Sequence, residues 1–180
     1  KALQLLQEIN KIILLRRLRD MDFGESEEQS MIREMVRGFA EDSLAPTCFD
    51  RDKEQRAPID EWNEFCEKTG LQGVTIPEQY GGSPIDSISE AIIVEELARV
   101  DPSFSVMFCV HVGLCSMTIA LHGNEEQKSK YLPRLASKEI GAYSLSEAGA
   151  GTDAAALGCK AKKSEDGVHY ILNGEKMWVT

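Results

Sequence analysis

The chain has 180 residues, of which 42% are hydrophobic and 28% are charged, and its formal net charge is −10 at pH 7. This composition is typical of a globular protein and excludes an intrinsically disordered one. The negative charge argues against broad nucleic-acid binding, which needs a basic surface. The length allows one ordinary domain, or one domain and part of a second.

Residues 1–20 differ in charge from the rest of the chain. They hold five basic and two acidic side chains, a local charge of +3, and apolar residues recur at helical spacing from Leu3 to Ile13. Such a basic amphipathic helix is typical of a membrane-surface or targeting element, of a helix that packs on a partner, or of an added extension. Met21-Asp22-Phe23 resembles a natural start, so we treat residues 1–20 as a separate extension.

Residues 21–137 are predicted to form a domain of helices. Ser26 to Gln29 is a capping box that opens the first helix. Pro58 begins a later helix, for which Gly70 offers the C-terminal cap. The residues expected to be buried in these two helices are Ile32, Met35, Val36 and Phe39, followed by Ile59, Trp62, Phe65 and Cys66.

The second half of this domain is also predicted to be helical. Residues 71–83 are rich in glycine and proline and are expected to be irregular. A helix then ends before Asp101-Pro102, and a nearly all-apolar helix over 103–121 is expected to be buried on most sides. We expect no apolar run to be long enough to span a bilayer. Asn124 to Gln127 is a second capping box, and the helix it opens ends near Leu135.

The apolar period changes after Lys138. Residues 140–147 alternate as a strand would, and Asp166-Gly167 and Asn173-Gly174 are typical hairpin-turn dipeptides. A chain in which helices come first and strands follow has the α+β pattern. We therefore predict an all-α N-terminal domain (21–137) followed by the first strands of a second domain (138–180). About forty residues are few for a sheet that buries a face, so we expect this domain to continue beyond Thr180.

Five cysteines occur, and no two of them form a CxxC pair. This pattern favours free thiols and a reducing compartment. Cys109, His111 and Cys115 fit no standard zinc spacing and lie in an apolar segment, so we predict no metal site there. His122, near a helix end, is interpreted as a contact to the helix dipole.

The segment from Tyr143 to Asp153 is the strongest candidate for a binding site. It lacks the third glycine of the dinucleotide fingerprint and the lysine of a P-loop. Its small residues would let backbone N–H groups approach a ligand closely, while Ser146 and Thr152 add hydroxyl donors. Glu147 and Asp153 could be an acid–base pair or simply cap turns. Trp178 could shield a ligand from water or belong to the core.

This segment resembles the first signature of the acyl-CoA dehydrogenases, and Met177 to Thr180 resembles the strand that faces the flavin in that family. Ser146 stands where many members have threonine, and Thr152 where many have serine; both exchanges keep the hydroxyl. The resemblance covers residues 21–180. Further matches in the same order and spacing lie at 40–46, 76–82, 94–98, 122–128 and 131–133.

The resemblance implies an N-terminal helical domain, a middle β-barrel domain and a C-terminal four-helix bundle that would lie outside these 180 residues. It implies a homotetrameric oxidoreductase that uses FAD to convert an acyl-CoA to the 2-enoyl-CoA and passes electrons to an electron-transfer flavoprotein. Ser146 would bond the pyrimidine edge of the flavin, Thr180 the nitrogen that accepts hydride, and Thr152 would also touch substrate. The implied cofactor-binding residues are Tyr143, Ser144, Leu145, Ser146, Glu147, Ala148, Gly149, Ala150, Gly151, Thr152, Trp178, Val179 and Thr180.

The catalytic base of this family is a glutamate of the C-terminal bundle, so the resemblance implies no catalytic residue within this chain, and little activity or FAD affinity for these 180 residues alone. The loop looks closest to short- and branched-chain members, whose pathways break down fatty acids or branched amino acids. The start at Met21 favours a bacterial cytoplasmic enzyme, with the mitochondrial matrix as the alternative. Two other functions stay open: an acyl-CoA oxidase or flavin monooxygenase on the same fold, and a non-catalytic interaction module.

Overall fold

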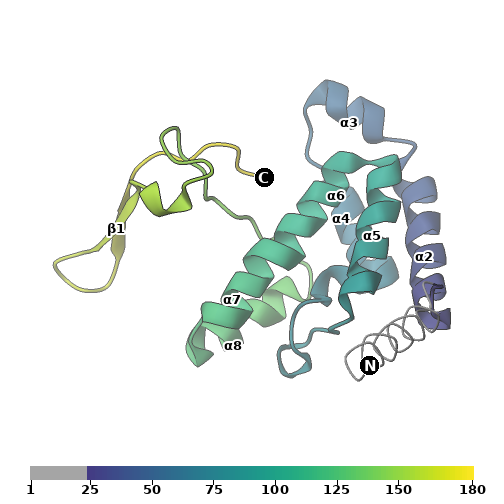
Figure 1. Ribbon diagram of the computed structural model, residues 1–180, viewed down its shortest axis with the longest axis horizontal. Coiled ribbons are helices and arrows are strands. Elements are labelled where there is room, and N and C mark those ends of the chain that lie inside the picture. Colours follow the sequence, from purple (N-terminus) through teal and green to yellow (C-terminus); the bar gives the residue numbers. More distant parts are fainter. Residues whose placement is uncertain (1–23) are drawn as a thin grey trace, which may run out of the picture.

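The computed structural model describes residues 24–180. The amphipathic helix predicted for residues 1–20 and the start at Met21 lie outside the described residues. The described chain is a body of helices followed by a small β-hairpin (Figure 1). This order confirms the predicted α+β class with an all-α N-terminal domain, whereas the division after residue 137 stays a prediction.

The helical body contains both regular helices and tighter or wider turns. The α-helices are α2 (Glu27–Phe39), α3 (Cys48–Glu54), α4 (Ile59–Thr69), α5 (Ser87–Val100), α6 (Pro102–Cys109), α7 (Met117–His122) and α8 (Glu125–Leu135). Within the body, η1 (Ala40–Leu44) and η4 (Val110–Ser116) are π-helices, and η2 (Leu71–Gly73) and η3 (Glu78–Tyr80) are 3₁₀-helices. A further 3₁₀-helix, η5 (Ala154–Ala156), follows the body. In Figure 1, α5 lies between α2 and α6.

Local signals in the sequence define several of these helix ends. Ser26 and Gln29 form the reciprocal bonds of a capping box, with N–O distances of 3.0 and 3.1 Å. Asn124 and Gln127 do the same at the start of α8. Gly70 ends α4 with a φ of 68°, a conformation that glycine adopts without a steric penalty. These three predicted helix ends are confirmed, whereas the helix expected to begin at Pro58 begins one residue later, at Ile59.

The core lies where α4 and α6 meet α2 and α5. Its largest fully buried side chains are aromatic, and the Phe65 ring contacts Phe104 and Phe108 edge-on, at centroid distances of 5.6 and 5.7 Å. Edge-to-face geometry is favoured by the ring quadrupoles and adds about 1 kcal/mol per pair to the burial of apolar area. Trp62 also lies in this cluster, and its indole N–H donates to the Lys138 carbonyl at 3.1 Å.

Two residues predicted to be buried are not. Met35 of α2 is 39% exposed and Ile59 of α4 is 47% exposed. In α2 the packing face contains Ile32, Val36 and Phe39, and Met35 lies about 100° around the helix from Val36. Helical spacing in the sequence identified the buried face of α2 correctly, except that it included Met35.

The apolar segment that follows α5 also differs from expectation. α6, η4 and α7 form one helix over Pro102–His122, with a mean hydropathy of 1.9, which by length and composition alone could cross a membrane. The expectation that no run has that length is therefore wrong. This helix was also expected to be buried on most sides, yet Val106, Leu114 and Leu121 are 44–67% exposed. Buried Phe104 and Phe108 nevertheless place one face of it in the protein core.

The strand predictions are confirmed only for the hairpin. β1 (Lys160–Lys163) pairs antiparallel with β2 (Tyr170–Asn173) around a turn that contains Gly167, with a φ of 71°. Residues 140–147 and 176–180 are not strands, and neither does Asn173-Gly174 connect two strands. A strand requires a ladder of hydrogen bonds to a neighbour, and among residues 24–180 these segments share one backbone bond, from Met177 N–H to the Ser146 carbonyl.

Two buried ionic groups join the helices. Glu96 of α5 accepts hydrogen bonds from Arg37 and Arg33 of α2, and these lower the pKa of its carboxyl group to about 2. Arg51 of α3 pairs with Glu61 of α4 at 2.6 Å and with Asp101 at the start of α6. A buried charge without its partners costs several kcal/mol, so each group fixes the relative placement of its helices.

His111 connects the helical body to the chain that leaves it. The ring is fully buried in η4, and its Nδ1 accepts a hydrogen bond from the Gly141 N–H at 2.9 Å. Nδ1 must therefore be unprotonated, so Nε2 carries the hydrogen and donates to the Gln72 carbonyl at 3.0 Å. Burial lowers the pKa of His111 to about 4, so the neutral ring persists at physiological pH.

We expect His111→Leu to destabilise the protein by on the order of 3 kcal/mol, because it leaves the Gly141 N–H and the Gln72 carbonyl buried without partners. It should also remove part of the acid sensitivity. In the parent, the unfolded histidine binds a proton below about pH 6.5 and the folded one does not, so stability falls as the pH drops from about 6.5 to 4.

Urea unfolding at pH 7 and pH 5 measures both effects. The exposed His169 provides the control, and His169→Leu should match the parent at each pH. An equal loss of stability on acidification in the parent and in His111→Leu would contradict this account of the ring.

Candidate functional site

The candidate loop begins where His111 holds the chain. Gly141 packs against the side chain of Cys115, and a Cβ at position 141 would lie 2.7 Å from the Cys115 sulfur. Only glycine therefore fits here without a shift of its neighbours. From Gly141 the chain runs without regular structure to Glu147, which forms an isolated antiparallel bridge with Ala150. The loop is thus anchored to the helical body at its start and closed on itself near its tip.

Glu147 is the most connected residue of the loop. Its carboxylate accepts hydrogen bonds from the backbone N–H of Gly158 at 2.6 Å and of Cys159 at 2.9 Å. It also accepts from the Lys176 ammonium at 2.7 Å. These bonds, with the Lys176 bond first, lower the pKa of Glu147 to about 2. At neutral pH this carboxylate is fully ionised and has no tendency to take up a proton, which argues against the acid–base interpretation.

Lys176 brings the two predicted cofactor segments together. Its ammonium donates to Glu147 and to the Leu145 carbonyl, the latter at 2.8 Å. The next residue, Met177, donates its backbone N–H to the Ser146 carbonyl at 2.8 Å. Residues 145–147 and 176–177 are therefore neighbours although about thirty residues separate them in the sequence.

The structure leaves the other predicted site residues open to solvent to different degrees. Ala150 is buried, Ser146 is half-buried, and Thr152 is exposed. Asp153 caps a turn by accepting from the Ala155 N–H, which agrees with the turn-capping interpretation. Trp178 is 86% exposed and has a φ of 58°, so the core interpretation of this residue is wrong. Positive φ is unusual for a bulky residue, and such strained conformations cluster at ligand-binding and active sites.

An apolar pocket of about 280 Å³ lies where Thr180 meets the helical body. The side of the pocket from α6 and η4 includes Ser103, Met107 and Val110, and Ile140 and Gly141 lie beside the exit of the chain. The sequence did not single these residues out. The apolar helix over 103–121 was a signal, but its spacing could not tell which residues turn toward Thr180.

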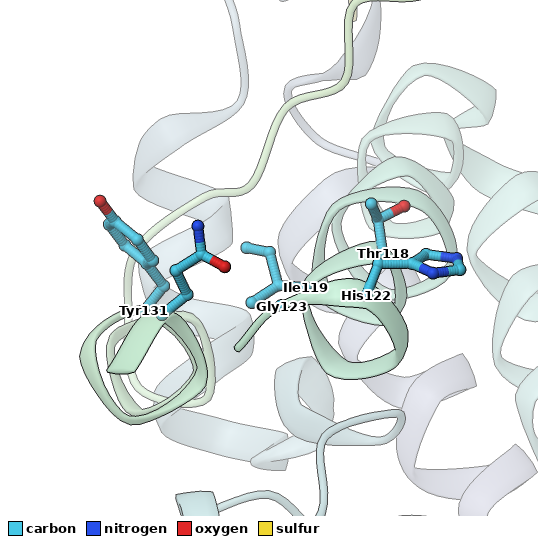
Figure 2. A pocket seen from close by; sticks show the side chains of 6 residues that line it. Thr118, Ile119, His122, Gly123 and Tyr131 are labelled. Carbon is cyan, nitrogen blue, oxygen red and sulfur yellow. The ribbon is translucent and has the colours of Figure 1, made fainter. Parts of the chain in front are cut away.

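A second groove, of about 340 Å³, lies between α7 and α8 (Figure 2). Ile119 points toward α8, and Tyr131 lies on the opposite side. Thr118 and His122 point away from Tyr131 in this view, so their polar atoms do not converge with its hydroxyl. Thr118, His122 and Tyr131 therefore do not form a cluster of polar groups that would orient a ligand.

No metal centre competes with this site in the part of the chain that the structure describes. Residues 24–180 contain no group of three His, Cys, Asp or Glu side chains that could hold a metal ion. All five cysteines are free thiols. Both ring nitrogens of His111 are engaged by backbone groups, which explains why it cannot serve as a ligand with Cys109 and Cys115.

The fold and the site define an α+β domain in which a helical body presents a small-residue loop beside an apolar pocket, an arrangement suited to binding an organic ligand. Residues 26–139 match the family model "Acyl-CoA dehydrogenase, N-terminal domain". This chain belongs to the acyl-CoA dehydrogenase family.

Two curated relatives illustrate the similarity. The short-chain-specific acyl-CoA dehydrogenase of Clostridium acetobutylicum is 40% identical over 161 residues, covering 89% of this chain and 42% of the relative. The mitochondrial isovaleryl-CoA dehydrogenase of Bos taurus is 39% identical over 167 residues, covering 87% and 37%. The chain thus spans about two fifths of the length of these relatives.

Solved structures agree with this assignment. An acyl-CoA dehydrogenase complexed with FAD from Bacillus anthracis superposes with a TM-score of 0.79 and 38% identity, covering 86% of this chain and 27% of that one. A chain from a study of the electron transferring flavoprotein of Acidaminococcus fermentans gives a TM-score of 0.80 and 41% identity, covering 88% and 41%. The resemblance predicted from the motifs is confirmed.

We expect the glycines of the site to separate into two groups on substitution by alanine. Gly141→Ala should destabilise the protein by about 1–3 kcal/mol, because the new Cβ overlaps Cys115. Gly149→Ala and Gly151→Ala should leave stability within about 0.5 kcal/mol, because no atom lies within 4 Å of the added Cβ. Thermal unfolding of the three variants tests this, and equal losses in all three would contradict the geometry of the loop.

Proposed function

We propose that this chain is the N-terminal part of an FAD-dependent acyl-CoA dehydrogenase that converts an acyl-CoA to the 2-enoyl-CoA and passes the electrons to an electron-transfer flavoprotein. The observation that carries the proposal is the junction at Glu147 and Lys176. It joins the loop at 143–153 to the segment at 176–180, whose last residue borders an apolar pocket.

The residues of the junction fit a flavin. Around Gly149 and Gly151 there is open space, so a flat ligand can approach their backbone N–H groups. Trp178 presents an almost fully exposed indole, which gains contact area when a ring system covers it. Bound FAD would supply the acceptor for the hydride that leaves the β-carbon of the substrate.

The chain's own hydroxyl groups would then orient and polarise that cofactor. We assign Ser146 to the pyrimidine edge, where a hydrogen-bond donor stabilises the negative charge that reduction creates. We assign Thr180 to the nitrogen that accepts hydride, and Thr152 to the cofactor and the substrate. Tyr143, Ser144, Leu145, Ala148, Ala150 and Val179 complete the proposed cofactor contacts.

The pocket beside Thr180 is the proposed place of the acyl chain. Its lining is almost entirely apolar, and burying each methylene group there would stabilise the complex by about 0.8 kcal/mol. Short and branched acyl chains are the proposed substrates, because the relatives include enzymes named for short-chain and isovaleryl substrates.

The base that removes the α-proton is proposed to lie beyond Thr180. Glu147 cannot take this role, because three donors hold its carboxylate and keep it ionised. We propose that the whole protein is a homotetramer and that it works in the bacterial cytoplasm, with the mitochondrial matrix as the alternative.

We predict that the full-length protein purifies with FAD and reduces an electron-transfer flavoprotein when an acyl-CoA is added. Anaerobic reduction of the bound flavin by butyryl-CoA or isovaleryl-CoA measures the first half of the reaction. Rapid oxygen uptake without reduction of the partner flavoprotein would instead identify an oxidase. A purified protein that takes up no flavin would sink the proposal.

Ser146→Ala and Thr180→Val should each slow reduction of the bound flavin by about tenfold or more, because a hydrogen bond to a charged group contributes about 1.5–3 kcal/mol. Thr118→Val, on α7 in the other groove, is the matched control and should reduce the flavin at the parent rate. Stopped-flow absorbance of the flavin gives these rates. Parent-like rates in both site variants would remove these residues from the proposed site.

A further inference from the structure

Glu147 and Lys176 form hydrogen bonds to backbone groups in addition to their own ion pair. One carboxylate oxygen of Glu147 accepts from Lys176 and from the Cys159 N–H, and the other accepts from the Gly158 N–H. Lys176 in turn bonds the Leu145 carbonyl. The pair therefore touches three separate stretches of backbone: the loop, the residues before β1 and the residues after β2.

The pair is also shielded from solvent. The side chains of Glu147 and Lys176 are 12% and 23% exposed, whereas Lys160, Lys162 and Lys163 on β1 are exposed. Charge-assisted hydrogen bonds are about twice as strong as neutral ones, and shielding from water strengthens them further. This ion pair is therefore a stronger constraint than a solvent-exposed pair, which contributes little to stability.

Among residues 24–180, a single backbone hydrogen bond joins the 145–147 stretch to the 176–180 stretch. Neither the 145–147 stretch nor the 176–180 stretch is a strand, so no ladder fixes one against the other. The hydrogen bond from Met177 N–H to the Ser146 carbonyl sets the two stretches side by side. Glu147 follows Ser146 and Lys176 precedes Met177, so the ion pair lies directly beside this bond. The side chains thus set a register that hydrogen-bonded strands would otherwise set.

We propose that Glu147 and Lys176 are positioning residues: they act as one unit that holds Ser146 in register with Thr180, so that both hydroxyl groups reach the same flavin. This inference rests on the proposed function for its chemistry, and on the ion-pair geometry for its mechanical part. The family resemblance implies that Glu147 contacts the cofactor. In this proposal, Glu147 instead holds in place the residues that do.

Two substitutions separate the members of the pair. Glu147→Gln places an amide NH₂ against donors, so we expect amide hydrogen exchange at Gly158, Cys159 and Met177 to quicken by about tenfold, and the dissociation constant for FAD to rise by about tenfold. Lys176→Met should have the smaller effect, because the backbone bonds of Glu147 remain. Lys176→Arg keeps the charge and should recover most of the parent behaviour. The double variant Glu147→Gln/Lys176→Met should resemble Glu147→Gln, because the two residues act as one unit.

Glu175→Gln and Lys162→Met are matched controls, because both remove one charge from an exposed side chain close by. They should leave exchange and FAD binding unchanged. In the full-length holoenzyme, Glu147→Gln should also shift the reduction potential of the remaining bound flavin, which a purely structural defect in the helical body would not do.

Different results would overturn the proposed function and the positioning role of Glu147 and Lys176. If the full-length parent binds no FAD, the proposed function fails, while the exchange rates still decide whether the pair sets the register. If Glu147→Gln exchanges like the parent, or if the losses in the two single variants simply add in the double variant, the positioning role is overturned. FAD binding by the parent together with unchanged affinity in Glu147→Gln overturns it as well.

Discussion

The buried ring of His111 is the interaction on which the placement of the candidate site depends. It ties the Gln72 carbonyl, on the turn after α4, to the Gly141 N–H, where the chain leaves the helical body. Both partners are backbone groups, so the ring constrains the main chain itself. Because burial keeps the imidazole neutral, one nitrogen donates and the other accepts, and only this tautomer satisfies both groups.

A second constraint acts at the far end of the same segment. His111 fixes where the loop begins, and Glu147 fixes how it folds against the residues before β1 and after β2. Beyond Glu147, no atom lies within 4 Å of a Cβ built at Gly149 or Gly151, so a ligand can approach the backbone N–H groups there. The helical body therefore fixes the start of the loop, and the loop carries residues that are proposed to bind the ligand.

The sequence predicted features that depend on near neighbours. The capping boxes at Ser26 and Asn124 and the left-handed Gly70 need only three or four residues to define them, so local rules were sufficient. The strand predicted at 140–147 failed because alternation says nothing about a partner. The roles of His111 and Lys176 could not be predicted either, because their partners lie about thirty or more residues away. Only the family resemblance, which reflects the whole fold, paired the two segments that Lys176 and Met177 bring together.

We propose that the loop at 143–153 and the segment at 176–180 form one flavin site. Titration of the flavin-free, full-length protein with FAD, followed by tryptophan fluorescence, tests it most directly. Of the two tryptophans in residues 1–180, Trp62 is fully buried in the helical core and Trp178, two residues after Lys176, is exposed, so FAD should quench Trp178 in preference to Trp62. We predict saturable quenching at one FAD per chain, with a clearly smaller amplitude in Trp178→Phe. Quenching of equal size in Trp178→Phe, with unchanged affinity, would contradict the claim.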